Sequence, residues 1–331
     1  MLFVMNYDKL TQKKLELDQY RPLPETLVRN LDDWFRIELT YTSNAIEGNT
    51  LTRQETTLVV EKGLTVGGKS LKEHLEATNH AEALDWIKDL IQKKPQSLTE
   101  KDILHIHYLI LKGIDDDNAG HYRDVPVRIS GSAVILPNPR KVPSLMSGLV
   151  KWIHHTDVHP VEFAAAAHYE LVSIHPFVDG NGRTGRLLMN LILMMHGYPP
   201  AIINNKDRLT YIESLEKAQL GGSKDDYLKI IIKAVERSLD IYLRAVRSED
   251  EPLISEESPQ YLRIGALAKA VQETVPTIRY WTKEGLLDVA YMTDSGYHFY
   301  ESEMIERVRR IKDLKKQRYT LSEIKKRLFK A

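Results

Sequence analysis

Residues 187–195 read Leu-Leu-Met-Asn-Leu-Ile-Leu-Met-Met, a stretch that is apolar on nearly every side when it is wound as a helix. A helix of this kind is stable only where other elements surround it. We therefore expect it to run through the core of its domain, and burial would fix in place the two arginines that precede it, Arg183 and Arg186. The segment from Gly197 to Pro200 ends the helix, because proline cannot continue it.

Helical periodicity extends over most of residues 25–246, as in Leu27, Leu31 and Trp34. Residues 125–137 depart from it, because they form two short β-prone runs around a Gly-Ser turn. That pattern predicts a small β-hairpin. The predicted fold class is mainly α: a helical core with one hairpin, followed by a second domain.

The length and charge of the chain indicate more than one domain. A chain of 331 residues exceeds the usual size of one hydrophobic core, so two or three domains are expected. The net charge is +0, yet residues 259–331 hold 15 Lys and Arg against 9 Asp and Glu, which leaves a balance of −6 on the remainder. Residues 248–260 are acidic, contain two prolines and no basic residue, and read as a linker.

Several protein classes are excluded by what the sequence omits. With no cysteine, a disulfide framework, a thiolate zinc site and a cysteine nucleophile are excluded. The apolar start covers only residues 1–5, and no later run approaches the roughly 20 residues that span a bilayer. We expect a cytoplasmic protein with no membrane partner.

Residues 175–186 read His-Pro-Phe-Val-Asp-Gly-Asn-Gly-Arg-Thr-Gly-Arg, a combination that suits nucleotide chemistry. His175 supplies a base that accepts a proton near neutral pH. Residues 180–182 permit a turn whose backbone N–H groups converge on phosphate oxygens, and a helix that begins there adds its positive end. Arg183 and Arg186 are three positions apart, so on that helix they share a face and can both hold a polyphosphate.

The pattern His-Pro-Phe-x-Asp-Gly-Asn-Gly-Arg-x-x-Arg is complete at every position. It resembles the signature of the Fic family, enzymes that usually move AMP from ATP onto protein hydroxyls. The resemblance covers roughly residues 25–246 and implies that His175 deprotonates a Ser, Thr or Tyr hydroxyl, which attacks the α-phosphorus of ATP. It implies Mg²⁺ held by Asp179, and phosphate contacts from Gly180, Asn181, Gly182, Arg183 and Arg186.

The resemblance also gives residues 125–137 a role as a flap that docks a segment of the target protein beside His175. The target protein is left open, self-modification included, and the same site could remove AMP from a modified protein. The oligomeric state is open as well, a homodimer included.

Base recognition is assigned to the helical stretch of residues 208–219, where Fic proteins often place an aromatic residue and an amide near adenine. Tyr211 and Gln219 are the candidates, because an aromatic face can stack on a base and an amide can read its edge. The alternative for Tyr211 is a ring that is simply packed against the protein.

A second phosphate motif is rejected. Residues 63–70 match the P-loop pattern G-x-x-x-x-G-K-S. That motif needs a buried strand before it and a parallel sheet beyond it, whereas helical periodicity follows from Leu71 onward. We interpret the segment as a glycine-rich turn between helices.

Residues 43–48 read Ser-Asn-Ala-Ile-Glu-Gly and end the first long amphipathic helix. Glu47 then faces the negative end of the helix dipole, an unfavourable place unless a cation compensates. The segment resembles the inhibitory motif of one Fic class, Ser/Thr-x-x-x-Glu-Gly/Asn. The resemblance implies that Ser43 and Glu47 are inhibitory and that Glu47 pairs with Arg186 in the space the γ-phosphate of ATP needs. The alternative is a surface glutamate at a frayed helix end.

Residues 261–331 carry a second pattern, with an Ile-Gly-Ala-Leu-Ala-Lys start and a later Thr-Ile-Arg-Tyr-Trp run. The order resembles the winged helix-turn-helix of the MerR family of transcription regulators. The resemblance implies DNA contacts from Thr277, Arg279 and Tyr280 in a major groove and a wing at residues 296–300. Gln272 stands in the turn where a glycine is usual, and a protein-binding module is the alternative.

These observations predict four segments: an N-terminal helical region at 1–95 with the inhibitory motif at 43–48, a Fic core at 96–247, an acidic linker at 248–260 and a winged helix-turn-helix at 261–331. The leading interpretation is an autoinhibited protein adenylyltransferase that uses ATP and Mg²⁺. The alternative is a DNA-binding regulator whose Fic domain senses nucleotide. The intact base at His175 favours the enzyme, since a sensor needs no general base.

Overall fold

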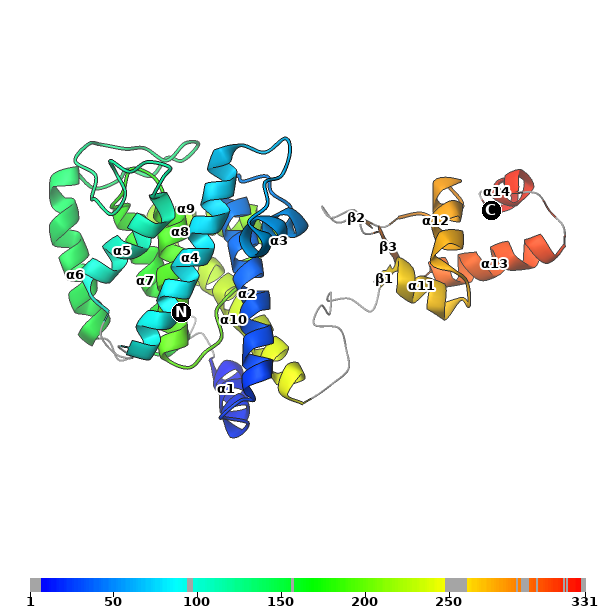
Figure 1. Ribbon diagram of the computed structural model, residues 1–331, viewed down its shortest axis with the longest axis horizontal. Helices are drawn as coiled ribbons and strands as arrows, with labels where there is room; N and C mark the ends of the chain where they lie inside the picture. Colours follow the sequence, from blue (N-terminus) through cyan, green and yellow to red (C-terminus); the bar gives the residue numbers. More distant parts are fainter. Residues whose placement is uncertain are drawn as a thin grey trace. The chain divides into compact units, whose positions relative to one another are not determined.

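The computed structural model describes residues 7–93, 98–155, 158–247, 261–289, 291–292, 298–301, 303–317, 319 and 321–328. The chain divides into two compact units, Met1–Leu253 and Ile254–Ala331 (Figure 1). The predicted acidic linker, residues 248–260, lies outside the described residues.

The first unit is built from helices, as the periodicity predicts. Its α-helices are α1 (Asp8–Gln19), α2 (Glu25–Ile46), α3 (Arg53–Lys62), α4 (Leu71–Lys93), α5 (Glu100–Leu111), α6 (Val142–His155), α7 (Pro160–Ile174), α8 (Asn181–Met195), α9 (Arg208–Gln219) and α10 (Asp225–Val246). Short 3₁₀ turns at Pro139–Lys141 and Asn205–Asp207 precede α6 and α9. The prediction of a mainly helical fold is confirmed.

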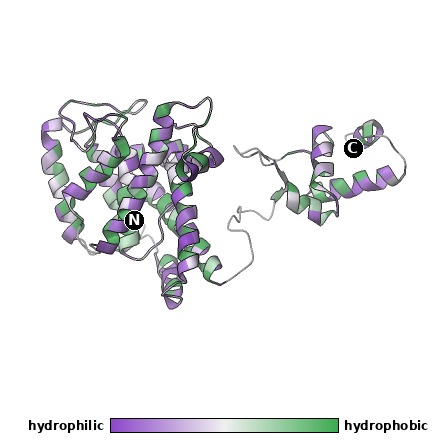
Figure 2. Cartoon of the chain, in the orientation of Figure 1, coloured by the Kyte–Doolittle hydropathy of each residue, from purple (hydrophilic) through white to green (hydrophobic). Residues whose placement is uncertain are grey.

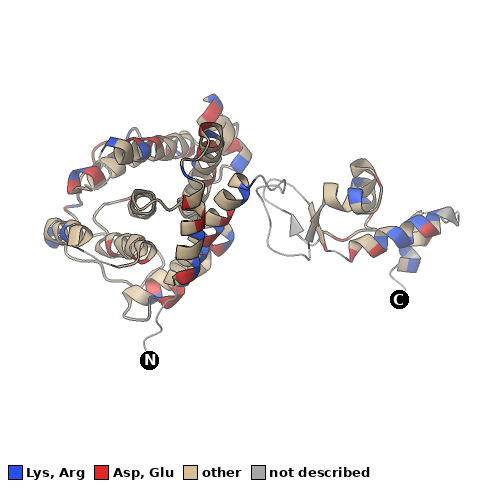
Figure 3. Ribbon diagram, turned by 90° about the horizontal axis from the view of Figure 1, so that it is seen from below, with Lys and Arg blue, Asp and Glu red and all other residues tan. Residues whose placement is uncertain are grey.

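Helix α8 is the central element of this unit. It contacts α2, α4, α5 and α7, and nearly all of its residues are buried. The single polar residue of the apolar stretch, Asn190, exchanges two hydrogen bonds with the backbone of Ala201. The outer helices carry polar residues on one side and apolar ones on the other (Figure 2), and charged residues are coloured along them in Figure 3. The sequence therefore places a buried helix inside a ring of amphipathic ones.

The prediction of a hairpin at residues 125–137 is wrong. All of these residues are described, and none of them lies in a strand. Its chain reverses at a turn in which Ser132 N–H donates to Ile129 O. Arg123, rather than a strand ladder, joins the two ends of the segment, since its guanidinium donates to Val125 O at 3.2 Å and Pro137 O at 2.7 Å.

The rejected P-loop is a turn between helices, as expected. Thr57 to Val60 belong to α3, which ends at Gly63 with a positive φ of 62°. Lys69 is engaged locally, because its Nζ donates to the backbone oxygen of Thr50 at 2.5 Å and to its hydroxyl at 3.0 Å. The segment lacks the strand that a P-loop requires.

Within its described residues, the second unit pairs a three-stranded antiparallel sheet with four helices. The elements are β1 (Tyr261–Arg263), α11 (Ile264–Ala270), α12 (Val275–Lys283), β2 (Tyr291–Met292), β3 (His298–Glu301), α13 (Met304–Lys316) and α14 (Leu321–Leu328), with the strands in the order β1-β3-β2. Ile278 and Trp281 of α12 pack in its core. Gln272, in the turn between α11 and α12, adopts a φ of 53°, so the backbone keeps the left-handed turn although the glycine is absent.

Among the described residues, none of the helices combines the length and the apolar character that crossing a bilayer would require.

Candidate active site

The predicted signature, residues 175–186, spans the loop between α7 and α8 and the first turns of α8. His175 caps α7 with φ 51° and ψ 59°, a left-handed conformation that few residues other than glycine adopt. Its N–H donates to Leu171 O at 2.8 Å, and its carbonyl accepts from Arg123 Nε at 2.7 Å. The backbone around the candidate base is therefore held from both sides.

The His175 ring presents one nitrogen for chemistry. Its Nδ1 lies 3.3 Å from Val172 O, and a carbonyl can only accept, so Nδ1 carries the proton and Nε2 is left to take one. Burial, the largest influence, lowers the pKa of His175 below its ordinary value near 6.5. The ring is therefore a neutral base at pH 7.

Asn181 closes the loop rather than reaching outward. Its side-chain oxygen accepts from Phe177 N–H at 3.0 Å and its amide donates to Phe177 O at 2.9 Å, and the side chain is buried. The side-chain amide is thus already paired with the Phe177 backbone, and the phosphate contact of Asn181 stays a prediction. Asn181 can offer its backbone N–H, as the first residue of α8.

His107 of α5 supports the same loop, which the sequence did not reveal. Its Nδ1 accepts from Gly120 N–H at 3.0 Å, so the proton lies on Nε2, which donates to Asp179 O at 3.0 Å. The ring stacks on Phe177 with centroids 3.6 Å apart. Burial is the main cause that lowers the pKa of His107 to about 4, so this contact persists at neutral pH. Gly180, with φ 77°, leaves room for the ring beneath it.

Arg183 is a buried cation with unused donors. Its side chain is 2% exposed and lies 3.2 Å from Glu76 Oε1 and 3.7 Å from Asp179 Oδ2. Its Nε and Nη1 have no well-aligned hydrogen-bond partner within the described residues, so the approach of Glu76 is an ion pair without a directed hydrogen bond. Buried donors of this kind need an acceptor, and a phosphate oxygen would supply one.

Arg186 is held by the C-terminal end of α2. Nε donates to Ser43 Oγ at 3.0 Å, and Nη2 donates to Ser43 O at 2.9 Å and to Glu47 Oε1 at 2.8 Å. Helix α2 ends at Ile46, where Arg208 Nε donates to the Ile46 carbonyl at 2.7 Å. The cation that Glu47 needs at this helix end is therefore Arg186.

The Glu47 carboxylate lies over the glycine turn. A Cβ placed on Gly182 would collide with Glu47 Oε1, so only glycine admits the carboxylate at this point. The first N–H groups of α8 have no intrahelical partner, which makes this end of the helix an anion site. Glu47 thus occupies a cradle that would suit a phosphate.

Asp179 has the properties of a magnesium ligand that would act together with substrate phosphates. Its side chain is about half exposed, with a relative exposure of 54%, and Oδ1 accepts from Gly180 N–H at 2.6 Å. The described part of the chain contains no cluster of three or more His, Asp or Glu that could hold a metal ion. Mg²⁺ is commonly bound by one or two carboxylates together with substrate phosphates. One carboxylate beside a phosphate cradle meets that requirement.

The two adenine candidates lie on α9, where one is buried and the other half-buried. Tyr211 is 2% exposed and belongs to the core, and its hydroxyl lies 2.8 Å from His168 Nε2. The expected stacking of Tyr211 on a base is wrong, because a buried ring offers no open face. Gln219 donates to Ser173 Oγ at 3.2 Å from a half-buried position, which leaves its amide oxygen for a ligand.

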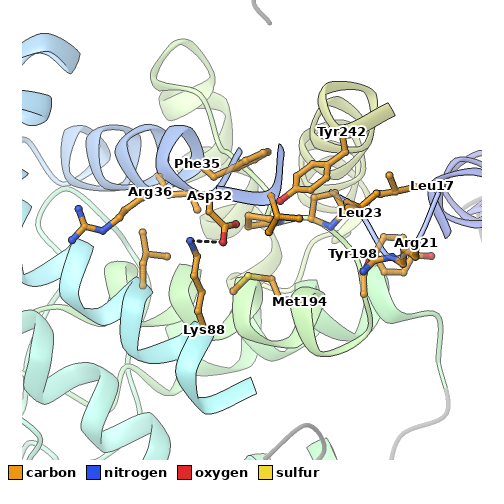
Figure 4. A pocket seen from close by; sticks show the side chains of 16 residues that line it. Leu17, Arg21, Leu23, Asp32, Phe35, Arg36, Lys88, Met194, Tyr198 and Tyr242 are labelled. Atoms are coloured by element: carbon orange, nitrogen blue, oxygen red, sulfur yellow. Dashed lines mark hydrogen bonds and ion pairs between the residues drawn. The ribbon is translucent and has the colours of Figure 1, made fainter. Parts of the chain in front are cut away.

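The apolar pocket of Figure 4 lies apart from the signature. It has a volume of about 190 Å³ and is lined by Leu17, Phe35, Met194, Tyr198 and Tyr242, with the Asp32–Lys88 ion pair beside it. Met194 stands near the end of α8 opposite to the signature, about 20 Å away at the helical rise. No signature residue lines it.

In the second unit, the DNA-contact candidates differ in accessibility. Arg279 and Tyr280 are exposed on α12, with Tyr280 51% exposed. Thr277 is engaged in the helix cap, since its N–H donates to Thr274 Oγ1 at 3.3 Å and the two hydroxyl groups lie 2.8 Å apart. Within the expected wing, residues 296–297 lie outside the described residues and 298–300 belong to β3.

Comparisons with known proteins agree with both patterns. Residues 97–193 match the model of the Fic/DOC family, and residues 262–329 match that of the MerR HTH family regulatory proteins.

Among curated proteins, the chain is 42% identical over 206 residues to "Protein adenylyltransferase Fic" of Nematostella vectensis, covering 61% of this chain and 48% of that protein. It is 37% identical over 256 residues to the protein of the same name of Culex quinquefasciatus, covering 76% and 50%. The chain therefore spans about half the length of the curated relatives it matches.

Among solved structures, Fic-1 from C. elegans shares 33% identity with a TM-score of 0.67, covering 73% of each chain. A Fic domain containing signaling protein from Bacteroides thetaiotaomicron shares 31% identity with a TM-score of 0.67, covering 74% of this chain and all of that one.

Proposed function

This chain belongs to the Fic family, and on that premise we propose that it transfers AMP from ATP to a Ser, Thr or Tyr hydroxyl of a target protein or of itself. One observation carries the proposal: the His175 base, the glycine turn and the orphaned donors of Arg183 meet at the buried N-terminus of α8. That arrangement places a proton acceptor beside an anion cradle, as phosphoryl chemistry requires.

In the proposed reaction, His175 Nε2 takes the proton of the target hydroxyl, and the hydroxyl oxygen forms a bond to the α-phosphorus. The bond from the α-phosphorus to its bridging oxygen breaks, and pyrophosphate leaves with the electron pair. Arg183 and the N–H groups that open α8 neutralise charge on the phosphates. Asp179 would hold Mg²⁺, which when bound neutralises phosphate charge.

We further propose that Glu47 and Ser43 restrain this activity. The Glu47 carboxylate and the γ-phosphate of ATP would use the same donors of Arg186, and one guanidinium edge cannot serve both. The direction of the reaction is part of this proposal, because a Glu47 carboxylate beside the cradle could instead position water to remove AMP from a modified protein.

The test uses Glu47→Gly incubated with cell lysate and ATP labelled either in the α-phosphate or in the γ-phosphate. Only the α-label should remain on protein, and a second substitution, His175→Asn, should abolish its retention. Asparagine tolerates the left-handed backbone at this position, so the variant removes the base without straining the turn. Retention of the γ-label would instead identify a kinase and refute the proposal.

The second unit supports a second proposed function, DNA binding. The observation behind it is the match of residues 262–329 to the MerR family together with the exposed Arg279 and Tyr280 on α12. An exposed arginine on a helix that follows a tight turn suits contact with a major groove.

A further inference from the structure

The last turn of α2, which immediately precedes Glu47, ends in carbonyl groups that the helix itself cannot bond. The last four carbonyls of a helix have no partner within it, and in α2 these belong to residues 43–46. The chain that follows takes the middle two. Asn44 O accepts from Glu47 N–H at 3.0 Å, and the next carbonyl, that of Ala45, accepts from Gly48 N–H at 3.1 Å. The first and the last of the four carbonyls are left for partners from other parts of the chain.

Two arginines from other helices bond these remaining carbonyls. Arg186 Nη2 of α8 donates to Ser43 O at 2.9 Å. Arg208 Nε, at the start of α9, donates to Ile46 O at 2.7 Å. Cations stabilise the negative end of a helix dipole, and the Glu47 carboxylate beside it increases the need for them.

The two arginines differ in what the proposed reaction asks of them. The γ-phosphate of ATP would take the Arg186 donors away from Ser43 and Glu47 together. Arg208 lies outside the signature, and its bond to Ile46 O uses none of the Arg186 donors. Of the two arginines, Arg208 therefore continues to hold the end of α2 while ATP competes for the other.

Arg208 reaches α2 from a support that depends on neither α2 nor α8. It follows a 3₁₀ turn that is joined to α10, since Asp207 Oδ2 lies 3.8 Å from Arg237 Nη2. Arg237 in turn donates to Ile202 O at 3.2 Å. The start of α9 can therefore stay in place when the Glu47 carboxylate leaves.

We propose that Arg208 is a positioning residue for the inhibition: it keeps α2 helical as far as Ile46 and so keeps the Glu47 carboxylate on Arg186. The inference rests on the proposed function, because it concerns when Glu47 yields to ATP. Ile46 is 2% exposed and directly precedes Glu47, so a loss of helical conformation at Ile46 would move the carboxylate. Removal of the Arg208 donor should therefore favour ATP without removing a phosphate contact.

Rates of labelled AMP incorporation in two backgrounds test the inference. In the otherwise unaltered chain, Arg208→Met should raise the rate about fivefold, since one charge-assisted hydrogen bond that favours the inhibited state is lost. In the Glu47→Gly background no carboxylate remains to be positioned, so Arg208→Met should change the rate less than about twofold. Arg208→Lys, which keeps a cationic donor, should restore part of the inhibition.

Lys206→Met is the matched control, since Lys206 is exposed on the same 3₁₀ turn, and it should leave the rates in both backgrounds unchanged. Equal rates for Arg208→Met and the unaltered chain would overturn the inference and leave the proposed function standing. A lower rate in both backgrounds would also overturn it, because Arg208 would then act in substrate binding. No incorporation by Glu47→Gly itself would overturn the inference and the proposed function together.

Amide hydrogen exchange without ATP gives a readout that does not depend on activity. In Arg208→Met, exchange should become faster at residues 43–49, where the N–H groups of Glu47 and Gly48 bond to the end of α2. Exchange in α10 should stay as it is in the unaltered chain. Unchanged exchange at residues 43–49, or an equal increase in α10, would overturn the inference, since Arg208 would then have no specific effect on the end of α2.

Discussion

Arg186 makes three hydrogen bonds to the end of α2, two to Ser43 and one to Glu47. Because these donors are already bonded to one helix end, the guanidinium can bind a phosphate there only if that helix end moves away. Arg183, a turn earlier, keeps unused donors. At the scale of single residues, the two arginines of the signature therefore differ: Arg186 is hydrogen-bonded to α2, whereas Arg183 keeps donors without a hydrogen bond.

The pH dependence of transfer tests the role of His175. Burial lowers its pKa, so the ring loses its proton at a lower pH than an exposed histidine does. The rate of AMP transfer by Glu47→Gly should rise with pH, with an apparent pKa below about 6.5, and level off near neutrality. An inflection clearly above pH 7 would contradict a neutral base.

The site residues that could be predicted from the sequence lie in short motifs, whereas those that could not be predicted are isolated along the chain. Glu47 and Arg186 stand in short local motifs, and the structure places them 2.8 Å apart. Arg123, Glu76 and His107 reach the loop from positions far away along the chain. No local pattern marks them, because their roles depend on which helices pack together.

At the scale of elements, residues 124–137 form the exposed segment beside the candidate base. β-propensity predicted a hairpin, but such propensity yields strands only where partners complete a ladder. Here Arg123 takes the carbonyls at both ends of the segment, and the Glu216 carboxylate accepts from Ser132 Oγ at 2.8 Å and Ala133 N–H at 2.9 Å. Hydrogen bonds from side chains thus hold this segment in place of the expected hydrogen bonds between two strands.

Replacing Arg123 tests this arrangement. Arg123→Met removes three hydrogen bonds to backbone carbonyls and should increase amide hydrogen exchange across residues 124–137. Transfer to a protein target should fall, while ATP binding in the Glu47→Gly background should change little. Arg128→Met, an exposed position in the same segment, is the control. Identical exchange in both variants would show that Arg123 does not hold the segment.

The helices were more predictable than this segment. The all-round apolar stretch of α8 indicated its central position, and the structure buries it. Glycine and proline located the end of that helix, whereas the buried hydrogen bonds that join His168 to Tyr211 and Tyr227 depend on how α7, α9 and α10 pack together.

At the scale of the whole molecule, buried neutral histidines link stability to pH. Burial lowers the pKa of His80 and His168 to about 3 each, and that of His107 to about 4. Below pH 6.5 the unfolded chain binds protons at these sites while the folded chain does not, so the free energy of unfolding falls as the pH falls. Each site contributes up to about 1.4 kcal/mol per pH unit.

Denaturant unfolding monitored by near-ultraviolet circular dichroism between pH 7 and 5 would measure this slope. Hydrogen bonds from Thr50 and Ser70 lower the pKa of Glu73 to about 2, so the titration of this carboxyl changes the free energy of unfolding only below this pH range. His80→Gln should flatten the slope, and the exposed His155→Gln should not. A free energy of unfolding that stays constant from pH 7 to 5 would contradict buried neutral rings.

If the second unit binds duplex DNA as proposed, its affinity should fall as salt is added, because phosphate contacts release counterions. In electrophoretic shifts with random duplexes, Arg279→Ala should cost about 1–3 kcal/mol and reduce sequence preference. Arg310→Ala, an exposed arginine of α13, should leave the preference intact. Absence of any shift at low salt would favour a protein-binding module.

In an active transferase, we expect Glu47 and ATP to compete for Arg186. The rate of labelled AMP incorporation into protein, compared between the unaltered chain and Glu47→Gly at the same ATP and Mg²⁺ concentrations, tests it most directly. Glu61→Gly, an exposed glutamate in α3, is the control and should leave the rate unchanged. Glu47→Gly should raise the rate by about tenfold or more, since it frees a charged hydrogen-bonding group for the γ-phosphate. Equal rates for the unaltered chain and Glu47→Gly would contradict it.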